Sequence, residues 1–170
     1  MAFFPCVQVV FSSVAALLGA PGQSNYSAAN AAVDRLASAA EKAGIPVVSI
    51  QWGAWGGSGM AAQDAATAAR ISRLGMAMLM PEQGLAALQG VVAHKISASL
   101  SSALCAAVPF NWKQFLQRSG TQDPLFAEFY QEDAASPITI LHPGNHIVTF
   151  SSFKPPLLHN LNLTWKKFGF

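Results

Sequence analysis

The stretch that decides the fold is "FSSVAALLGAPGQSNYSAAN", Phe11 to Asn30. It leaves an apolar run, crosses the turn-rich segment "GAPGQ" and enters an alanine-rich run with helical spacing. Tyr26 and Asn30 lie four residues apart, so on a helix they share one face. Ligands of open parallel sheets bind outside the carboxyl ends of strands. We therefore expect Ser13 and the first turn of the next helix to meet at one such edge.

Strand and helix patterns alternate on both sides of this stretch. Short apolar runs predict strands at residues 6–11, 46–52 and 103–110, the first of them buried on both faces because it lacks alternation. Helical periods predict helices at residues 24–43, 62–74 and 81–94, with a short helix in "NWKQFLQR". Ser24 is expected as the N-cap of the first helix, which Gly44 and Pro46 end. This order predicts an α/β fold built of βαβ units around a parallel sheet.

The segment after about Gln131 differs in composition from the rest. Residues 1–133 hold seven Lys or Arg and eight Asp or Glu, a net charge of −1. Residues 134–170 hold three Lys and no acid, a net charge of +3, with several prolines and no helical period. A linker, an extra hairpin and sequence foreign to the domain remain open for this tail.

Composition bounds the class of protein. A length of 170 residues suits one domain or a large piece of one. No run of 18 apolar residues predicts a membrane span, and the start lacks the basic region of a signal peptide. Cys6 and Cys105 lack metal-ligand spacing and are typical of core thiols in a reducing compartment, so we expect a cytoplasmic protein without a metal site. Without a basic stripe, nucleic-acid binding has no support.

A serine and a tyrosine at one sheet edge suit carbonyl chemistry. A phenol, with a pKa of about 10, is a poor acid at neutral pH unless a cation lowers that value. It can then protonate a developing alkoxide. A serine hydroxyl beside it can hydrogen-bond the same carbonyl oxygen while a cofactor delivers hydride.

The segment "FSSVAALLGAPGQSNYSAANAAVDRLA" resembles the active site of ketoreductase domains from modular polyketide synthases and animal-type fatty acid synthases. These domains belong to the short-chain dehydrogenase/reductase superfamily. The resemblance continues through "IPVVSIQWGAWGGSGMA" and "LMPEQGLAAL" to about residue 118. It implies the C-terminal part of a Rossmann-like doubly wound parallel sheet without the N-terminal nucleotide-binding half. The expected division is 1–118 ketoreductase, 119–133 linker and 134–170 an unassigned tail.

The resemblance also implies roles for single residues. Tyr26 would be the proton donor, Ser13 would hydrogen-bond the substrate ketone, and Asn30 would stand where most superfamily members carry lysine. It assigns a second group to the cofactor side, namely Ser12, Trp52, Gly53 and Trp55. It assigns a third group to the substrate and its stereochemistry, namely Leu18, Pro21, Gln23, Asn25 and Met60.

Two markers bear on product configuration. Family members that yield the D-alcohol often carry proline five residues and asparagine one residue before the tyrosine, which here are Pro21 and Asn25. Members of the opposite class carry tryptophan eight residues before it, where this chain has Leu18. The resemblance therefore favours the D-type.

Two parts of the family pattern are missing. No lysine precedes Ser13, and no glycine-rich turn of the cofactor site lies on that side. The formal G-x-G-x-x-A at residues 57–62 follows the catalytic segment and has no acid about 20 residues on, so we do not expect it to bind pyrophosphate. The chain is expected to be a fragment that is inactive by itself.

The resemblance implies a parent enzyme of a multifunctional synthase. That parent would use NADPH to reduce a β-ketoacyl thioester, held through phosphopantetheine on an acyl carrier protein, to the β-hydroxyacyl thioester. The other domains of a polyketide synthase would be its partners. One alternative is a catalytically inactive structural remnant. Another is a free-standing reductase of small ketones, which Asn30 disfavours.

Overall fold

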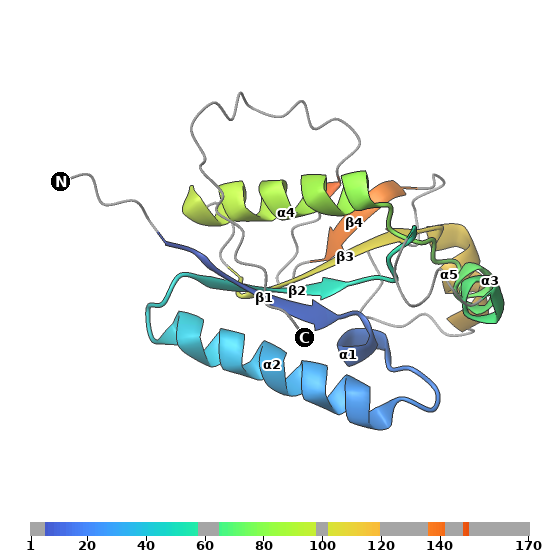
Figure 1. The fold of residues 1–170 in the computed structure, drawn as a ribbon, viewed down its shortest axis with the longest axis horizontal. Coiled ribbons are helices and arrows are strands. Elements are labelled where there is room, and N and C mark those ends of the chain that lie inside the picture. Colours follow the sequence, from blue (N-terminus) through green and yellow to red (C-terminus); the bar gives the residue numbers. More distant parts are fainter. Residues whose placement is uncertain (1–5, 58–64, 98–101, 120–135, 142–147, 150–170) are drawn as a thin grey trace.

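A five-stranded sheet in the order β1-β2-β3-β4-β5 is the centre of the computed structural model, which describes residues 6–57, 65–97, 102–119, 136–141 and 148–149 (Figure 1). The strands are β1 (Gln8–Ser13), β2 (Val47–Trp52), β3 (Leu104–Phe110), β4 (Ser136–Leu141) and β5 (Val148–Thr149). β1 pairs with β2 and β2 with β3 in parallel, whereas β4 and β5 are added antiparallel. The predicted α/β fold with a parallel sheet is confirmed.

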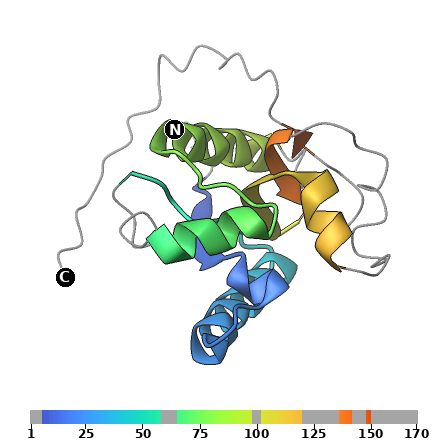
Figure 2. The same ribbon diagram turned by 90° about the vertical axis from the view of Figure 1, so that its right-hand side faces the viewer.

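Helices cover both faces of this sheet. α2 (Ser24–Lys42) lies on one face and α4 (Pro81–Ile96) on the other (Figure 1). α3 (Ala65–Arg73) and α5 (Trp112–Ser119) lie at the end toward which β1 points, as Figure 2 shows from that side. The predicted helices agree with these bounds to within about three residues. The four-residue α1 (Ala15–Leu18), which directly follows β1, was not predicted.

The two sides of β2 differ in chemistry. Toward α4, its apolar residues share one buried cluster that contains Val48, Ile50, Trp52, Leu79, Ala87, Val91, Cys105 and Ala107. Toward α2, its residues are Val47, Ser49 and Gln51, all of them buried. The strand is thus covered on both faces, although Ser49 and Gln51 interrupt its apolar pattern.

β1 is less buried than its sequence predicts. Only Ser12 among its residues is buried, and the side chain of Phe11 is 57% exposed. The expectation that this strand is covered on both faces is wrong for the described part of the chain. There β2 is the one strand that pairs with β1, so β1 forms an edge of the sheet.

α2 begins and ends with different local chemistry. Gln23 is the N-cap and makes no side-chain capping bond, so the expected cap at Ser24 is wrong and Ser24 is the first helical residue. At the other end Gly44 adopts a φ of 83°, and the backbone N–H of Ile45 donates to the carbonyl of Ala40 at 3.0 Å. This left-handed glycine ends the helix as predicted, because it costs glycine no steric strain.

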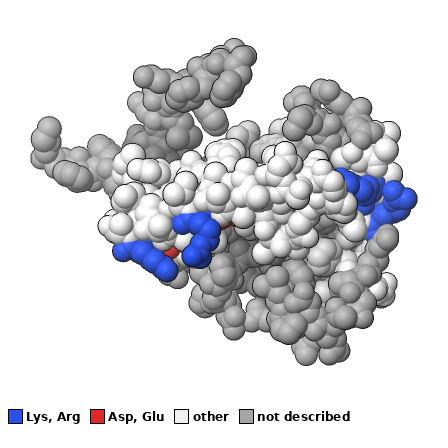
Figure 3. Space-filling view, turned by 90° about the horizontal axis from the view of Figure 1, so that it is seen from below, with Lys and Arg blue, Asp and Glu red and all other residues white. Residues whose placement is uncertain are grey.

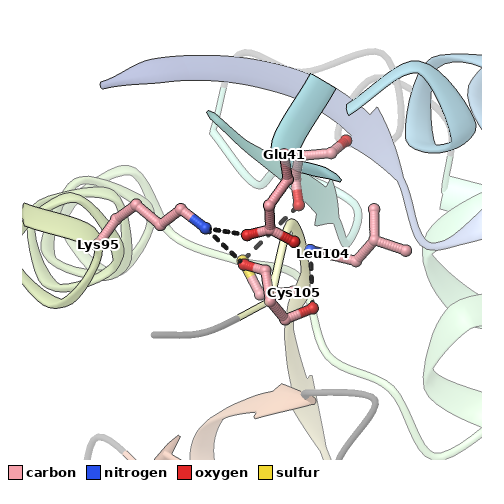
Figure 4. Close-up of polar contacts among 6 residues, drawn as sticks. Glu41, Lys95, Leu104 and Cys105 are labelled. Atoms are coloured by element: carbon pink, nitrogen blue, oxygen red, sulfur yellow. Dashed lines mark hydrogen bonds and ion pairs between the residues drawn. The ribbon is translucent and has the colours of Figure 1, made fainter. Parts of the chain in front are cut away.

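An ion pair joins the last turns of α2 and α4 at the amino end of the strands (Figure 4). Lys95 donates to the Glu41 carboxylate and, at 3.2 Å, to the carbonyl of Ser102. The Lys95 side chain is only 8% exposed. This contact ties the two helices together at the end of the sheet opposite to that of Ser13.

Among the described atoms seen from below, most belong to uncharged residues, and those of Lys and Arg form two separate groups (Figure 3). Within the range 134–170, the described strands β4 and β5 form an antiparallel pair, and the assignment of this tail stays a prediction. No helix in the described ranges is long and apolar enough to cross a membrane.

Candidate active site

Ser13 ends β1 at the carboxyl edge of the parallel strands. It pairs in register with Trp52 of β2, and the backbone N–H of Val14 donates to the Trp52 carbonyl at 2.9 Å. The hydroxyl oxygen of Ser13 accepts a bond from the backbone N–H of Ala15 at 3.2 Å. Ser13 is half-buried. Accepting this bond does not use the hydroxyl proton, which Ser13 can still donate to a ligand at the edge.

Tyr26 lies on the first turn of α2, at the same end of the sheet as Ser13 (Figure 1). The chain reaches it through a turn in which Gly19 and Gly22 have φ values of 73° and 74°, which glycine adopts without strain. The Tyr26 side chain is 46% exposed. Its phenol is therefore accessible from the solvent at the edge where Ser13 ends its strand.

Asn30 lies one turn after Tyr26. Its Nδ2 donates to the backbone carbonyl of Tyr26 at 2.9 Å, so the amide is held within α2. The backbone carbonyl of Asn30 accepts a bond from the Ser12 hydroxyl at 3.4 Å. Ser12 is buried and bonds to α2, so its hydroxyl is engaged in joining the helix to the sheet.

The loop after β2 carries the other residues predicted on the cofactor side. The Trp52 ring lies 5.5 Å from that of Phe11 and 5.1 Å from that of Trp55, measured between centroids. Trp52 Nε1 is buried and has no hydrogen-bond acceptor within the described part of the chain. Gly53 is buried, and a Cβ there would lie 3.2 Å from Cγ1 of Val108.

Trp55 is held by the chain that follows α3. It forms a bridge with Leu79, where the Leu79 N–H donates to the Ala54 carbonyl at 2.7 Å and the Gly56 N–H donates to the Leu79 carbonyl at 2.9 Å. Its indole packs on Gly84 of α4, where a Cβ would lie 2.2 Å from the ring. The loop is thus anchored on α4.

The residues predicted for substrate and stereochemistry divide into two groups. Leu18 packs against the cluster of Val108, Phe110 and Trp112, so its side chain belongs to the core beside the site. Exposed positions on the turn into α2 and its first residues form the other group, which contains Pro21, Gln23 and Asn25. Met60 lies outside the described residues.

A buried acid on α2 was missed by sequence reasoning. Asp34 is 5% exposed, and its two carboxylate oxygens accept bonds at 2.7 Å, one from Ser49 Oγ and one from Gln51 Nε2. With the Ser12–Asn30 bond, these contacts join α2 to the sheet, and we call Ser12, Asn30, Asp34, Ser49 and Gln51 the α2 seam. Two features of the sequence could have indicated this buried acid and its partners. Asp34 continues the four-residue step from Tyr26 and Asn30, and the polar Ser49 and Gln51 alternate within an apolar strand.

The arrangement suits a reaction at a carbonyl oxygen. Ser13 ends β1 at the carboxyl edge of the parallel strands, Tyr26 is exposed on the first turn of α2, and the buried Trp52 pairs in register with Ser13 on the neighbouring strand. No group of three His, Cys, Asp or Glu that could hold a metal ion occurs among residues that the structure describes. The hydroxyl groups of Ser13 and Tyr26 can donate hydrogen bonds and transfer protons.

Comparison with known proteins agrees with this geometry. The KR domain family matches residues 6–57. The chain is 42% identical to polyketide synthase GfsB of Streptomyces halstedii over 107 residues, which are 63% of this chain and 2% of that protein. It is 48% identical to the spectinabilin polyketide synthase system protein NorB of Streptomyces orinoci over 87 residues, 50% of this chain and 4% of that protein.

Solved structures lead to the same group. The first ketoreductase of the tylosin PKS matches with a TM-score of 0.56 and 35% identity over 66% of this chain and 23% of that chain. A C2-type ketoreductase from a modular polyketide synthase matches with a TM-score of 0.58 and 34% identity over 71% of this chain and 24% of that chain. This chain therefore spans about a quarter of each of these two ketoreductases.

Proposed function

We infer the function of the chain from the family to which it belongs, the ketoreductases of modular polyketide synthases in the short-chain dehydrogenase/reductase superfamily. We propose that it carries the proton-donating part of a site that reduces a β-ketoacyl thioester to the β-hydroxyacyl thioester. The observation that carries this proposal is the accessible Tyr26 phenol on the first turn of α2, at the sheet edge where Ser13 ends β1.

The two hydroxyl groups have separate tasks. The Ser13 hydroxyl donates a hydrogen bond to the ketone oxygen and stabilises the negative charge that develops there. Tyr26 Oη then gives its proton to that oxygen as the carbon–oxygen double bond becomes single. NADPH, when bound, supplies the hydride that adds to the carbonyl carbon. Asn30 holds the first turns of α2 together by its bond to the Tyr26 carbonyl.

The described residues fit the nicotinamide end of such a cofactor. Trp52 Nε1 is a buried donor for which the described residues provide no acceptor, and Trp52 pairs in register with Ser13. A carboxamide oxygen is an acceptor suited to such a group. We assign Trp52, with the backbone of Gly53 and the loop that carries Trp55, to the nicotinamide side. Ser12 would support α2 there rather than touch the cofactor, because its hydroxyl bonds to the carbonyl of Asn30.

The partner and the product follow from the same proposal. The β-ketoacyl group would arrive on the phosphopantetheine of an acyl carrier protein within a polyketide synthase, which acts in the cytoplasm. Pro21, Gln23 and Asn25 are exposed on the turn into α2 and its first residues, where they can border the substrate and favour the D-hydroxy product. Residues 1–118 would form the ketoreductase part and 119–133 a linker, with 134–170 an unassigned tail.

The test is NADPH oxidation with a β-ketoacyl thioester, measured for the 170-residue chain and for the longest polypeptide encoded continuously with it. In whichever of these two polypeptides oxidises NADPH with the thioester, Tyr26→Phe should lower kcat by about 10²–10⁴-fold, because it removes the general acid and little else. Tyr130→Phe, which changes the only other tyrosine, is the matched control and should keep the rate. Turnover retained in Tyr26→Phe would refute the role of Tyr26, and a product of L configuration would refute the D assignment.

A further inference from the structure

We propose that the α2 seam sets the axial position of the catalytic helix on the sheet, and that Asp34 is thereby a positioning residue for Tyr26. The consequence for catalysis rests on the proposed function, whereas the structural statement does not. The seam lies outside the atoms that would touch substrate or cofactor. It acts through the helix that carries the proton donor.

The apolar contacts of α2 are concentrated in its second half. The buried cluster on this face of the sheet joins Ala37 to Val47 and Ala103, with Val10 and Ala40 beside it. Between Ser24 and Val33 no residue of α2 is fully buried. α1 also contacts α2, but Ala15 is its one buried residue. Alanine side chains form shallow ridges, so packing alone specifies the position of this helix along its axis only weakly.

Hydrogen bonds supply the directional contacts that packing lacks here. Asp34 uses both carboxylate oxygens, each at 2.7 Å, on two residues of β2 that lie on the same side of the strand. Such bonds weaken steeply as distance and angle depart from their optimum, whereas apolar burial is non-directional. A slide of α2 would break both bonds and leave a buried carboxylate without its donors, which is costly.

The seam is coupled to the site through the backbone of the helix. α2 is continuous from Ser24 to Lys42, so a shift at Asp34 is carried to Tyr26, two turns or about 12 Å away. Asn30, midway between them, is also held to the sheet through the Ser12 hydroxyl. A misplacement of 1 Å in a reacting group can cost about 10²-fold in rate. The polar contacts thus give the phenol a defined place that an alanine-rich interface would not.

Two serines provide a matched test. Ser49 Oγ bonds the Asp34 carboxylate from β2, whereas Ser38 Oγ bonds the Asp34 backbone carbonyl within α2 at 3.0 Å. Both can be changed to alanine in the full 170-residue chain, in a Tyr130→Phe background labelled with 3-fluorotyrosine so that Tyr26 gives the only fluorine signal. Ser49→Ala should shift or broaden the Tyr26 resonance, and Ser38→Ala should leave it in place.

Two further variants separate position from stability. Asp34→Asn should keep the resonance, because the Gln51 amide can rotate to accept a bond from the new side-chain amide. Replacement of Asp34 and its two donors on β2 by apolar residues (Asp34→Leu, Ser49→Val, Gln51→Leu) should keep or raise Tm. Well-packed apolar residues often replace buried polar groups without loss of stability. The same variant should give a broadened or multiple Tyr26 resonance.

The result that overturns the inference is a Tyr26 resonance in Ser49→Ala that superimposes on that of the unchanged chain. If the triple variant does not fold, the comparison of Ser49→Ala with Ser38→Ala still decides. Where the chain or its longer form turns over, Ser49→Ala should lower kcat with little change in KM. An unchanged fluorine signal would reject the seam even if Tyr26 proves to be the proton donor, so the two proposals fail separately.

Discussion

The six residues of β2 are divided between two faces of the sheet, and the two faces pack against their helices in different ways. Toward α4, Val48, Ile50 and Trp52 are no more than 5% exposed and contact only apolar neighbours in their cluster. Toward α2, Ser49 and Gln51 are also buried, yet both bond to a carboxylate. The apolar face removes area from water, which stabilises the fold without specifying direction. The polar face contributes less net stability, but its directional hydrogen bonds restrict where α2 can lie on the sheet.

This difference matches what each helix has to do. α4 supports the loop of Trp55 by contact between the indole and Gly84, and it carries none of the residues assigned to catalysis. α2 carries Tyr26 on its first turn, and under the proposed function it must hold Tyr26 at one place relative to Ser13. A buried polar contact beside a catalytic element is therefore expected, because hydrogen-bond geometry restricts a helix in ways that apolar packing does not.

The largest effect should come from the apolar face. Ile50→Ala removes a side chain that is 0% exposed and should lower the free energy of unfolding by about 2–5 kcal/mol, because the site cannot fully close around the cavity. Ser49→Ala, its neighbour on the other face, should cost about 1–3 kcal/mol through the donor lost to Asp34. Urea unfolding followed by tryptophan fluorescence measures both. Equal losses in the two variants would contradict the division of roles between the faces.

A smaller loss is expected where α4 meets the loop after β2. Gly84→Ala would place a Cβ 2.2 Å from the Trp55 ring, and overpacking of this kind costs about 1–3 kcal/mol. The gain in helix propensity, up to about 1 kcal/mol, offsets only part of it. Near-ultraviolet circular dichroism should also change, since Trp55 must move and its ring lies 5.1 Å from that of Trp52.

The double variant Gly84→Ala with Trp55→Phe is the control for this contact. A phenyl ring is shorter than an indole and can leave room for the new methyl group, so the second change should restore part of the stability lost in the first. Losses that simply add would show that the two residues do not interact, since independent sites are additive to within about 0.3–0.5 kcal/mol.

Much of the fold follows from local patterns, and the exceptions have a common cause. β2 is bounded by Pro46 and Gly53, and its position is predicted to within one residue. The helical period of α2 is also predicted, but its apolar residues do not mark its buried face. Leu36 is 70% exposed while Asp34 is buried. Hydrophobic periodicity does not reveal an acid whose donors lie 15 and 17 residues further along the chain.

The candidate site likewise contains residues that local patterns predict and residues whose contacts depend on the tertiary structure. Ser13, Tyr26 and Asn30 could be picked from spacing and family resemblance because each stands at a strand end or on a helix face that sequence reveals. The engagement of Ser12 by α2 could not be foreseen, since it depends on how the helix lies across β1. The burial of Leu18 depends likewise on α1, a helix too short to give a periodic signal. Their catalytic and binding roles remain predictions.

The smallest effect at neutral pH concerns a thiol on the apolar face. The pKa of the Cys105 thiol is raised from 9.0 to about 12, chiefly by burial and in addition by the charge of Asp34, while Lys95 acts in the opposite direction. Since the pKa is higher in the folded chain, the thiol lowers stability only above about pH 9, where the unfolded chain loses a proton that the folded chain keeps. Between pH 9 and about 12 the free energy of unfolding should fall by up to about 1.4 kcal/mol per pH unit.

Cys105→Ala is the variant that isolates this slope. It should be less stable than the unchanged chain by a constant amount up to about pH 9, and the difference should then narrow as pH rises. Below pH 9 a thiol reagent should label only the exposed Cys6 in the folded chain and both cysteines in urea. Parallel stability curves above pH 9, or rapid labelling of Cys105 in the folded chain, would mean that water reaches the face toward α4, and the contrast between the two faces of β2 would not hold.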